Sequence, residues 1–242
     1  MPPIYAVGDI HGQLGQLEHV LALIDADGGG QVVFLGDYVD RGPDSCGVIQ
    51  TLVDGVTAGQ DWICLKGNHD RLMQWFLLDP PRHDPHLLIG FHWFHERIGG
   101  IETMQSYGLD LPEHIRLQDF SASAREVVPE PHIAFLENLS LSHETETLFF
   151  CHAGIAPSVP LAHQREEDLL WIRQPFHAVS EPHPKLIVHG HTPVDRATHY
   201  GNRVNLDAGA GYGRPLAAAV FDDGEVFELT DTGRVRMSPV IG

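Results

Sequence analysis

Polar side chains follow five predicted strands, in short glycine-rich patterns that could together bind a ligand. The patterns are GDIHG, GDYVDRG, GNHD, FFCHAG and VHGHTP, in that order along the chain. Residues i and i+2 of extended backbone point the same way, so Asp9 and His11 can reach one point. In open α/β sheets, ligands bind beyond the carboxyl ends of the strands. We therefore expect one site formed by Asp9, His11, Asp37, Asn68, His152 and His191.

The donor set of this expected site favours metal ions that bind hard or borderline ligands. It offers carboxylates, an amide oxygen and imidazoles without a thiolate cage, which suits Mn²⁺, Fe or Zn²⁺. Two such ions about 3.5–4 Å apart need a bridging ligand, and an aspartate carboxylate serves naturally. A pair of ions lowers the pKa of a bridging water and orients a phosphoryl group. The pattern thus predicts two-metal phosphate chemistry.

Some of these residues, and others of reactive type, also have simpler explanations. Asp9 or Asp37 alone could cap the helix that follows it, and only the joint pattern favours a site. Cys151 lies on an apolar strand, so we expect a buried, inert thiol rather than a nucleophile. A histidine-rich segment could hold a further metal, but no acidic residue or cysteine completes a set there at a familiar spacing. We expect a structural or solvated role for its members, His83, His86, His92 and His95.

The site must be positioned by strands that alternate with helices. Apolar runs at 4–7, 32–35 and 62–65 predict strands, and apolar spacing predicts helices over 14–24 and 48–56. This β-α-β-α-β order with short loops is typical of a sheet covered by helices. Strands return late in the chain, which favours an α/β fold with a mixed sheet or two sheets. The later predicted strands are 148–151, 186–189, 204–206, 216–221 and 226–229.

Residues 71–140 interrupt the strands and carry short helical patterns separated by proline-rich breaks. We expect this segment to be a helical insertion within a single domain of residues 1–242, rather than a second domain. The expected helices cover 72–78, 87–98, 101–107 and 133–139.

The composition argues against several classes of protein. The 15 basic and 33 acidic residues give a formal net charge of −18, which makes the surface a poor partner for nucleic acid or anionic membranes. Three cysteines far apart suggest neither a disulfide framework nor a cysteine zinc site. The first residues lack a signal-peptide pattern, and no apolar run approaches the length of a membrane span. We expect a cytoplasmic protein, of an oligomeric state that the sequence leaves open.

The five motifs, in this order, resemble those of the calcineurin-like metallophosphoesterases. Within that superfamily they are similar to the PPP-type serine/threonine phosphatases, especially the small bacterial and phage forms. The resemblance covers Gly8 to Thr192, and the LDAGAG run near Asp207 extends it. It implies a fold in which mixed β-sheets are sandwiched by α-helices, in α/β/β/α order. It also implies two divalent metal ions, with Mn²⁺ expected and Fe or Zn²⁺ as alternatives.

The same resemblance implies a role for each candidate ligand. Asp37 would bridge the two ions. Pro193 stands where many wider relatives carry another histidine, which would leave the first metal with fewer protein ligands. Asp9 and His11 would complete the first metal, and Asn68, His152 and His191 would complete the second.

Catalytic roles follow from the implied reaction, in which a metal-bridging hydroxide attacks phosphorus and the leaving alkoxide needs a proton. His69 is the expected general acid, oriented and kept charged by Asp40, and a third metal ligand is its alternative role. Arg41 offers a planar fork for phosphate oxygens. Arg173 is a second candidate, because similar phosphatases carry an arginine after this region. Tyr212 is expected to border the substrate cleft.

These roles predict a phosphomonoesterase that acts on phosphoserine or phosphothreonine in proteins, with phosphotyrosine as a further substrate. The alternative is a symmetrical diadenosine tetraphosphatase, which shares the metal motifs. Asp40 and the Thr192-Pro193 pair argue against it, because those enzymes often lack the aspartate and have a different last motif. A catalytically silent binding module is a third hypothesis, disfavoured because no predicted metal ligand is missing. The expected partner is therefore a phosphoprotein or a small phosphorylated substrate.

Overall fold

The first and last strands of the chain form one six-stranded sheet, ordered β11-β10-β9-β1-β2-β3. In the computed structural model, which describes residues 2–111 and 116–240, β1, β2 and β3 run parallel to one another. The antiparallel strands β9, β10 and β11 extend the sheet on the β1 side. The strands are β1 (Ile4–Val7), β2 (Gln31–Phe34), β3 (Trp62–Cys64), β9 (Ala218–Asp222), β10 (Glu225–Thr230) and β11 (Gly233–Arg236).

A second, five-stranded sheet has the order β4-β5-β6-β8-β7. Its central strands β5, β6 and β8 run parallel, and β4 and β7 are antiparallel strands at the two edges. The strands are β4 (Ser142–Glu144), β5 (Leu148–Cys151), β6 (Leu186–His189), β7 (Thr198–His199) and β8 (Arg203–Asn205). Each sheet therefore contains three adjacent parallel strands, so carboxyl ends of several strands in each sheet can meet on one side.

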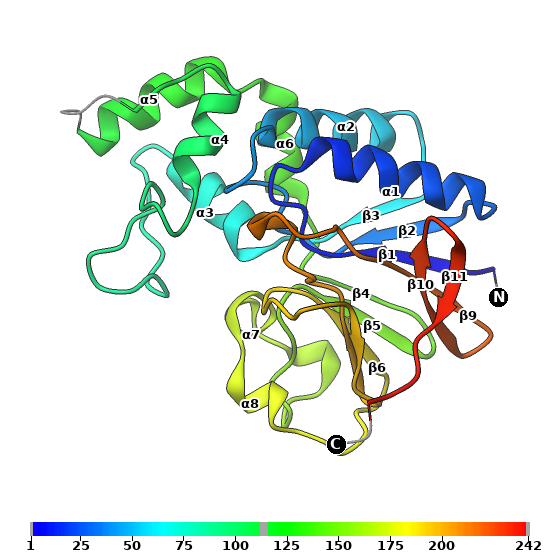
Figure 1. The fold of residues 1–242 in the computed structure, drawn as a ribbon. Helices are drawn as coiled ribbons and strands as arrows, with labels where there is room; N and C mark the ends of the chain where they lie inside the picture. The colour runs from blue at the N-terminus through cyan, green and yellow to red at the C-terminus, as the bar shows by residue number, and fades with distance from the viewer. Residues whose placement is uncertain (1, 112–115, 241–242) are drawn as a thin grey trace.

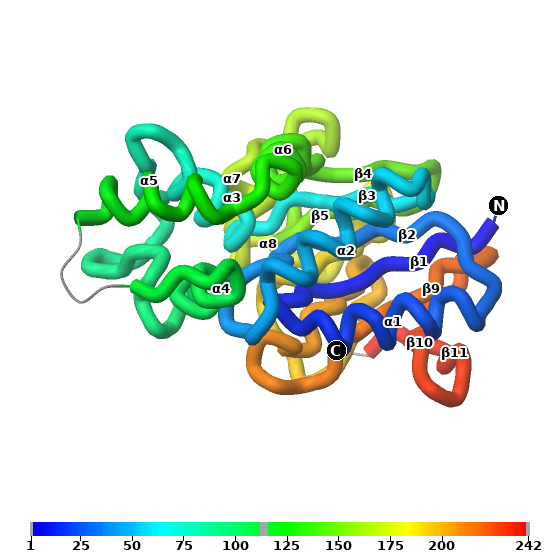
Figure 2. The backbone as a smooth tube through the Cα atoms, turned by 90° about the horizontal axis from the view of Figure 1, so that it is seen from above, coloured from blue at the N-terminus to red at the C-terminus, as the bar shows by residue number. Residues whose placement is uncertain are grey.

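Helices cover the outer face of each sheet (Figures 1 and 2). α1 (Leu14–Ala26) and α2 (Ser45–Thr57) lie over the first sheet, and α7 (Glu166–Trp171) and α8 (Gln174–His177) lie against the second. The predicted α/β class, with mixed sheets between helices, is confirmed. Among the described residues, no helix has both the length and the apolar content needed to cross a bilayer.

Alternating side chains along the strands explain how these layers stack, because successive residues of a strand face opposite sides of its sheet. In β1, Tyr5 and Val7 belong to the core under α1 and α2, whereas Ala6 belongs to the core between the sheets. In β5, Phe150 faces the first sheet, and Phe149 packs with residues of α7 and α8. Three apolar cores thus hold four layers together.

The segment 71–140 contains helices beside the first sheet and a long irregular loop, visible at the left of Figure 1. The predicted helices at 72–78, 101–107 and 133–139 correspond to α3, α4 and α6, and α5 is an additional helix. Residues 112–115 lie outside the described residues. The helices are α3 (Asn68–Phe76), α4 (Gly100–Ser106), α5 (Leu117–Val127) and α6 (Glu130–Asn138).

The predicted helix over 87–98 is wrong, because this stretch forms isolated turns. The backbone N–H groups of Leu87, Phe91 and His95 each donate to the carbonyl three residues earlier, without a continuing ladder. Gly90 interrupts the segment with a φ of 85°, a left-handed conformation that a right-handed helix does not contain.

Candidate metal centre and active site

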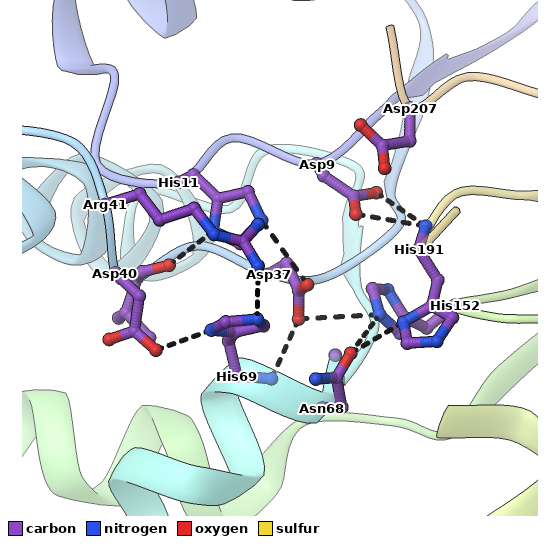
Figure 3. Close-up of polar contacts among 12 residues, drawn as sticks. Asp9, His11, Asp37, Asp40, Arg41, Asn68, His69, His152, His191 and Asp207 are labelled. Atoms are coloured by element: carbon purple, nitrogen blue, oxygen red, sulfur yellow. Dashed lines mark hydrogen bonds and ion pairs between the residues drawn. The ribbon is translucent and has the colours of Figure 1, made fainter. Parts of the chain in front are cut away.

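The carboxyl ends of β1, β2, β3, β5 and β6 bring most of the predicted site residues together (Figure 3). Each residue lies in the loop that follows its strand or in the first turn of α3. No member exposes more than 6% of its surface to solvent. The residues are Asp9, His11, Asp37, Asp40, Asn68, His69, His152 and His191.

Asp37 stands between two groups of histidines. Its Oδ2 lies 3.5 Å from Nε2 of His11, and its Oδ1 lies 3.4 Å from Nε2 of His152. Side-chain atoms of His11, Asp37 and His69 lie within 4.8 Å of one another, and so do those of Asp37, His152 and His191. One carboxylate is therefore shared by two clusters of metal-ligand type, which is the arrangement that a bridging ligand requires.

Backbone carbonyls fix the protonation of two of these imidazoles. Nδ1 of His11 lies 2.8 Å from the Val39 carbonyl, and Nδ1 of His152 lies 2.9 Å from the Leu35 carbonyl. A carbonyl only accepts, so each Nδ1 donates, and each neutral ring presents the Nε2 lone pair to the site. Nε2 of His152 also lies 2.9 Å from Oδ1 of Asn68. Acceptors that face one another without a proton between them fit a metal cation.

Asp9 lies beside the backbone of His191. Its carboxylate oxygens accept the backbone N–H of His191 at 3.0 and 3.3 Å, and Asp9 belongs to neither three-residue cluster. Burial, and then the charge of Asp207, raises the pKa of Asp9 well above its usual value. Burial also raises the pKa of Asp37 to about 7. Buried carboxylates this close together are costly unless cations compensate them, so the residues present fit divalent metals.

His69 and Asp40 form the expected pair. Nδ1 of His69 lies 2.6 Å from Oδ2 of Asp40, whose side chain is fully buried. Burial raises the pKa of Asp40 and lowers the pKa of His69. The two groups therefore hold one proton between them, and Nε2 of His69 is the atom left to exchange a proton with a ligand.

Two residues of the 71–140 segment hold Asp40 in place, and neither was predicted. Nε1 of Trp93 donates to Oδ2 of Asp40 at 2.9 Å, and Oγ1 of Thr103 donates to Oδ1 at 2.8 Å. Both residues are buried. The segment therefore contributes directly to the orientation of the Asp40–His69 pair.

The two predicted arginines border the same site. The Arg41 guanidinium donates to Nε2 of His11 and, at 3.0 Å, to Nε2 of His69. Nε of Arg173 donates to Nε2 of His191 at 3.1 Å. Both lie beside the metal-ligand clusters and line the adjoining cavity, where their planar donor groups could bind phosphate oxygens.

The loops that carry these residues adopt strained backbone conformations. Six residues other than glycine have positive φ among those the structure describes, and all but Asp223 belong to the site: His11, Asp37, Asp40, Arg41 and His191. Such conformations cost of order 1–3 kcal/mol each and gather at functional sites.

Asp70 is one of the groups that hold this backbone, because its buried carboxylate accepts the N–H groups of Gly67, Asp37 and Tyr38 at 2.8–2.9 Å. Asp70 and Asp207 were not predicted as site residues. The signal was available for both, since each follows a strand end as the predicted ligands do.

A cavity of about 490 Å³ opens beside the two clusters. It is lined by Asp37, His69 and His191 and by Tyr212, which confirms the expected place of Tyr212. The histidine-rich segment does not gather into a metal cluster within the described residues. Cys151 is buried on β5, and burial raises the pKa of its thiol, as an inert role requires.

The chain is similar to known proteins in sequence and in structure. The chain is 24% identical over 249 residues to bis(5'-nucleosyl)-tetraphosphatase PrpE [asymmetrical] of Bacillus thuringiensis, covering 92% of each protein. The crystal structure of a candidate diadenosine tetraphosphatase is similar with a TM-score of 0.65, at 22% identity, over 98% of this chain and 94% of that one. A serine/threonine phosphatase from Saccharomyces cerevisiae is similar with a TM-score of 0.54, at 16% identity, over 99% and 81%.

These two solved structures establish a shared fold. The profile of a protein family covers most of the sequence, matching residues 2–221. The matched range contains every predicted ligand together with the cavity beside them. Members of this family depend on two metal ions, which agrees with the clusters around Asp37. The chain therefore belongs to the calcineurin-like phosphoesterases, as its motifs predicted.

Proposed function

We propose that this chain is a dimetal-dependent hydrolase of dinucleoside polyphosphates. The observation that carries the proposal is the cavity beside Asp37, whose volume of about 490 Å³ lies within the range of small-molecule sites. Arg41 and Arg173 border it as candidate phosphate ligands. The name of the Bacillus thuringiensis relative, a bis(5'-nucleosyl)-tetraphosphatase, supports the same class of substrate.

In this proposal Asp37 would bridge two divalent ions, and each ion would be completed by ligands of its own. Bound there, the ions would supply activation of a water molecule and compensation of phosphate charge. The donor set suits Mn²⁺, Fe or Zn²⁺, and Mn²⁺ is the ion that we expect. Asp9 and His11 would hold the first ion, and Asn68, His152 and His191 the second.

The other site residues act on the phosphate and on the leaving group. The guanidinium groups of Arg41 and Arg173 bind non-bridging oxygens and orient the phosphoryl group for in-line attack by water. As the bond from phosphorus to the leaving oxygen breaks, Nε2 of His69 gives that oxygen a proton. A proton of the attacking water later restores the His69–Asp40 pair.

A second candidate function is the hydrolysis of phosphoserine or phosphothreonine in proteins. The observation that favours it is the hydrogen bond of 2.6 Å between His69 and Asp40. A serine or threonine alkoxide needs a proton to leave, whereas a phosphate leaving group from an anhydride needs it much less. An intact His69–Asp40 pair therefore contributes more to the rate of a phosphomonoesterase than to that of an enzyme that hydrolyses phosphate anhydrides.

A competition of substrates separates the two functions. With Mn²⁺ present, we expect the initial rate on diadenosine tetraphosphate to exceed that on phosphoserine and phosphothreonine peptides by tenfold or more at equal concentration. Chromatography of the products distinguishes two ADP from ATP plus AMP, and the name of the relative favours the latter pair. A tenfold preference for the peptides would overturn the nucleotide proposal and leave the metal centre intact.

The hydrogen bond from Trp93 to Asp40 predicts that a change at Trp93 lowers the rate through the Asp40–His69 pair. Trp93→Phe keeps an aromatic ring but removes the N–H that donates to Asp40 at 2.9 Å. A hydrogen bond to a charged group contributes about 1.5–3 kcal/mol, so we expect kcat on phosphoserine to fall roughly tenfold. The fall on p-nitrophenyl phosphate should be smaller, because nitrophenolate leaves without an acid.

The matched control is Trp75→Phe, which changes a tryptophan that stacks on Arg71 and Arg82 rather than on the site. Thermal unfolding of both variants checks that the fold is kept. An equal loss on the two substrates would show that Trp93 acts through packing alone.

A further inference from the structure

The loop between α3 and α4 lies at the left of Figure 1, and its residues form one wall of the active-site cavity. We propose that Phe91 and Arg97 of this loop form a subsite for the base and the outer phosphates of a nucleotide substrate, an inference that rests on the proposed function. The subsite lies in the same cavity as the metal-ligand clusters, so one substrate can occupy both. It identifies nucleotide-binding residues beyond the metal ligands, the acid pair and the two predicted arginines.

The charges around the cavity point to a substrate with more than one phosphate. Among the described residues that line it, Arg41, Arg97 and Arg173 are cationic and Asp37 is the one carboxylate. This is the reverse of the whole chain, in which acidic residues outnumber basic ones to give −18. Arg97 forms no ion pair within the described part of the chain, and its guanidinium lies 5.9 Å from the centre of the Phe91 ring. A guanidinium without a carboxylate partner can bind phosphate oxygens.

The aromatic rings of the same wall point to a planar group. Phe91 lines the cavity, and the imidazole of His95 stacks on it at 3.7 Å with an angle of 10° between the rings. On another side of the cavity lies Tyr212, whose ring is covered by Arg41 at 4.9 Å. Rings that are backed by a cation or an imidazole make stacking surfaces for nucleobases, because every base has a π-face.

Ion pairs, one of them fully buried, tie the start of this wall to α3 and α7 before any ligand binds. Asp84, near the start of the loop, accepts from Nε of Arg71 at 3.0 Å and pairs with its NH2 group at 2.7 Å. Arg71 and His86 both reach Glu167 of α7 at 3.1 Å. His86 in turn stacks on Trp171, another residue of the cavity wall, at 5.3 Å. A wall that is already ordered loses less conformational entropy when a substrate binds.

The test compares Arg97→Gln and Phe91→Leu with Arg82→Gln. Arg82 lies on the same loop and also stacks on an aromatic ring, Trp75 at 4.1 Å, but it does not line the cavity. With Mn²⁺ present, we expect kcat/KM for diadenosine tetraphosphate, relative to p-nitrophenyl phosphate, to fall about tenfold or more in each subsite variant. Arg82→Gln should keep the wild-type ratio.

A binding measurement makes the inference independent of the natural substrate. ADP and inorganic phosphate are compared as inhibitors of p-nitrophenyl phosphate hydrolysis by the wild type. We expect ADP to inhibit at least tenfold more tightly than phosphate, and Arg97→Gln to reduce that advantage. Such a result supports the subsite even if peptides prove to be the better substrates and the proposed function fails.

Two outcomes would overturn the subsite. One is ADP inhibition no tighter than that of phosphate in the wild type. The other is rapid hydrolysis of diadenosine tetraphosphate by both subsite variants, with the same substrate ratio as Arg82→Gln. In that second case the proposed function stands and the subsite alone is lost.

Discussion

Asp37→Asn is expected to lower kcat/KM on every phosphate substrate by about 10³-fold. Metal ions contribute several kcal/mol of charge stabilisation in the transition state, and each 1.36 kcal/mol corresponds to about tenfold in rate. The two oxygens of Asp37 face His11 and His152 at 3.5 and 3.4 Å. An amide of the same shape replaces one oxygen with a donor nitrogen and removes the charge, so it cannot bridge two cations.

Metal content gives a readout besides activity. After incubation with Mn²⁺ and removal of free metal, the wild type should retain two ions per chain and Asp37→Asn fewer. Mn²⁺ should raise the unfolding temperature of the wild type more than that of the variant, because a ligand stabilises the state that binds it. In the absence of metal at pH 8, the variant should unfold at no lower temperature, since burial raises the pKa of Asp37 to about 7 and the charged carboxylate is then costly.

The matched control is Asp44→Asn. Asp44 caps α2 by accepting the N–H of Gly47, and asparagine caps a helix about as well as aspartate. This variant should bind metal and turn over substrate like the wild type. Two retained ions and full activity in Asp37→Asn would show that another group links the clusters.

The sequence predicted that the candidate ligands gather, because they follow strands that are visible as short apolar runs. The carboxyl ends of neighbouring parallel strands meet at one edge of their sheet, which predicts that the residues after them gather there. Asp37 and His152 follow strands of different sheets, and the stacking of the two sheets brings their side chains within 3.4 Å. The exact partners were harder to predict. The contact of the Asp9 carboxylate with the N–H of His191, 182 residues away, depends on loop conformations rather than on strand spacing.

The support of the acid pair could not be read from the sequence. Trp93 and Thr103 reach Asp40 across 53 and 63 residues of chain. Trp93 lies in the irregular loop, where Phe91 faces the cavity and Phe94 joins the apolar core. That division gives the loop an apolar spacing similar to that of a helix, which explains the wrong helix over 87–98.

Three of the elements that the sequence did not predict share a physical reason. In α5, the buried residues are Phe120, Ser121 and Ala124, which give a weak apolar pattern. Strands β4 and β7 have three and two residues at the edges of the second sheet, too few to show an alternation. Both types of element are held by tertiary contacts rather than by local sequence preference.

His69→Asn is expected to have an effect that depends on the leaving group. General acid catalysis contributes roughly 10²–10⁴-fold, so kcat on phosphoserine should fall by about that factor. On p-nitrophenyl phosphate the loss should be at least tenfold smaller, because that leaving group departs without a proton. The loss of kcat on diadenosine tetraphosphate should lie between these two losses, since a phosphate leaving group needs the proton less than an alkoxide does.

A double variant that combines His69→Asn with Asp40→Asn tests whether these two residues act as a unit. Asp40 is argued to work through His69, so the double variant should lose little more on phosphoserine than His69→Asn alone. Independent losses that multiply would show that Asp40 acts separately on the reaction.

The alternative role for His69 makes a different prediction for the same variants. The structure places His69 within 4.8 Å of His11 and Asp37, close enough for a shared metal ion. If His69 were a ligand, His69→Asn would lose metal and slow phosphoserine and p-nitrophenyl phosphate to the same extent. The hydrogen bond of 2.6 Å to Asp40 engages Nδ1, so Nε2, which accepts from Arg41 at 3.0 Å, is the atom that a substrate would meet once Arg41 turns to its phosphate. We therefore expect full metal content together with a loss that grows as the leaving group becomes more basic.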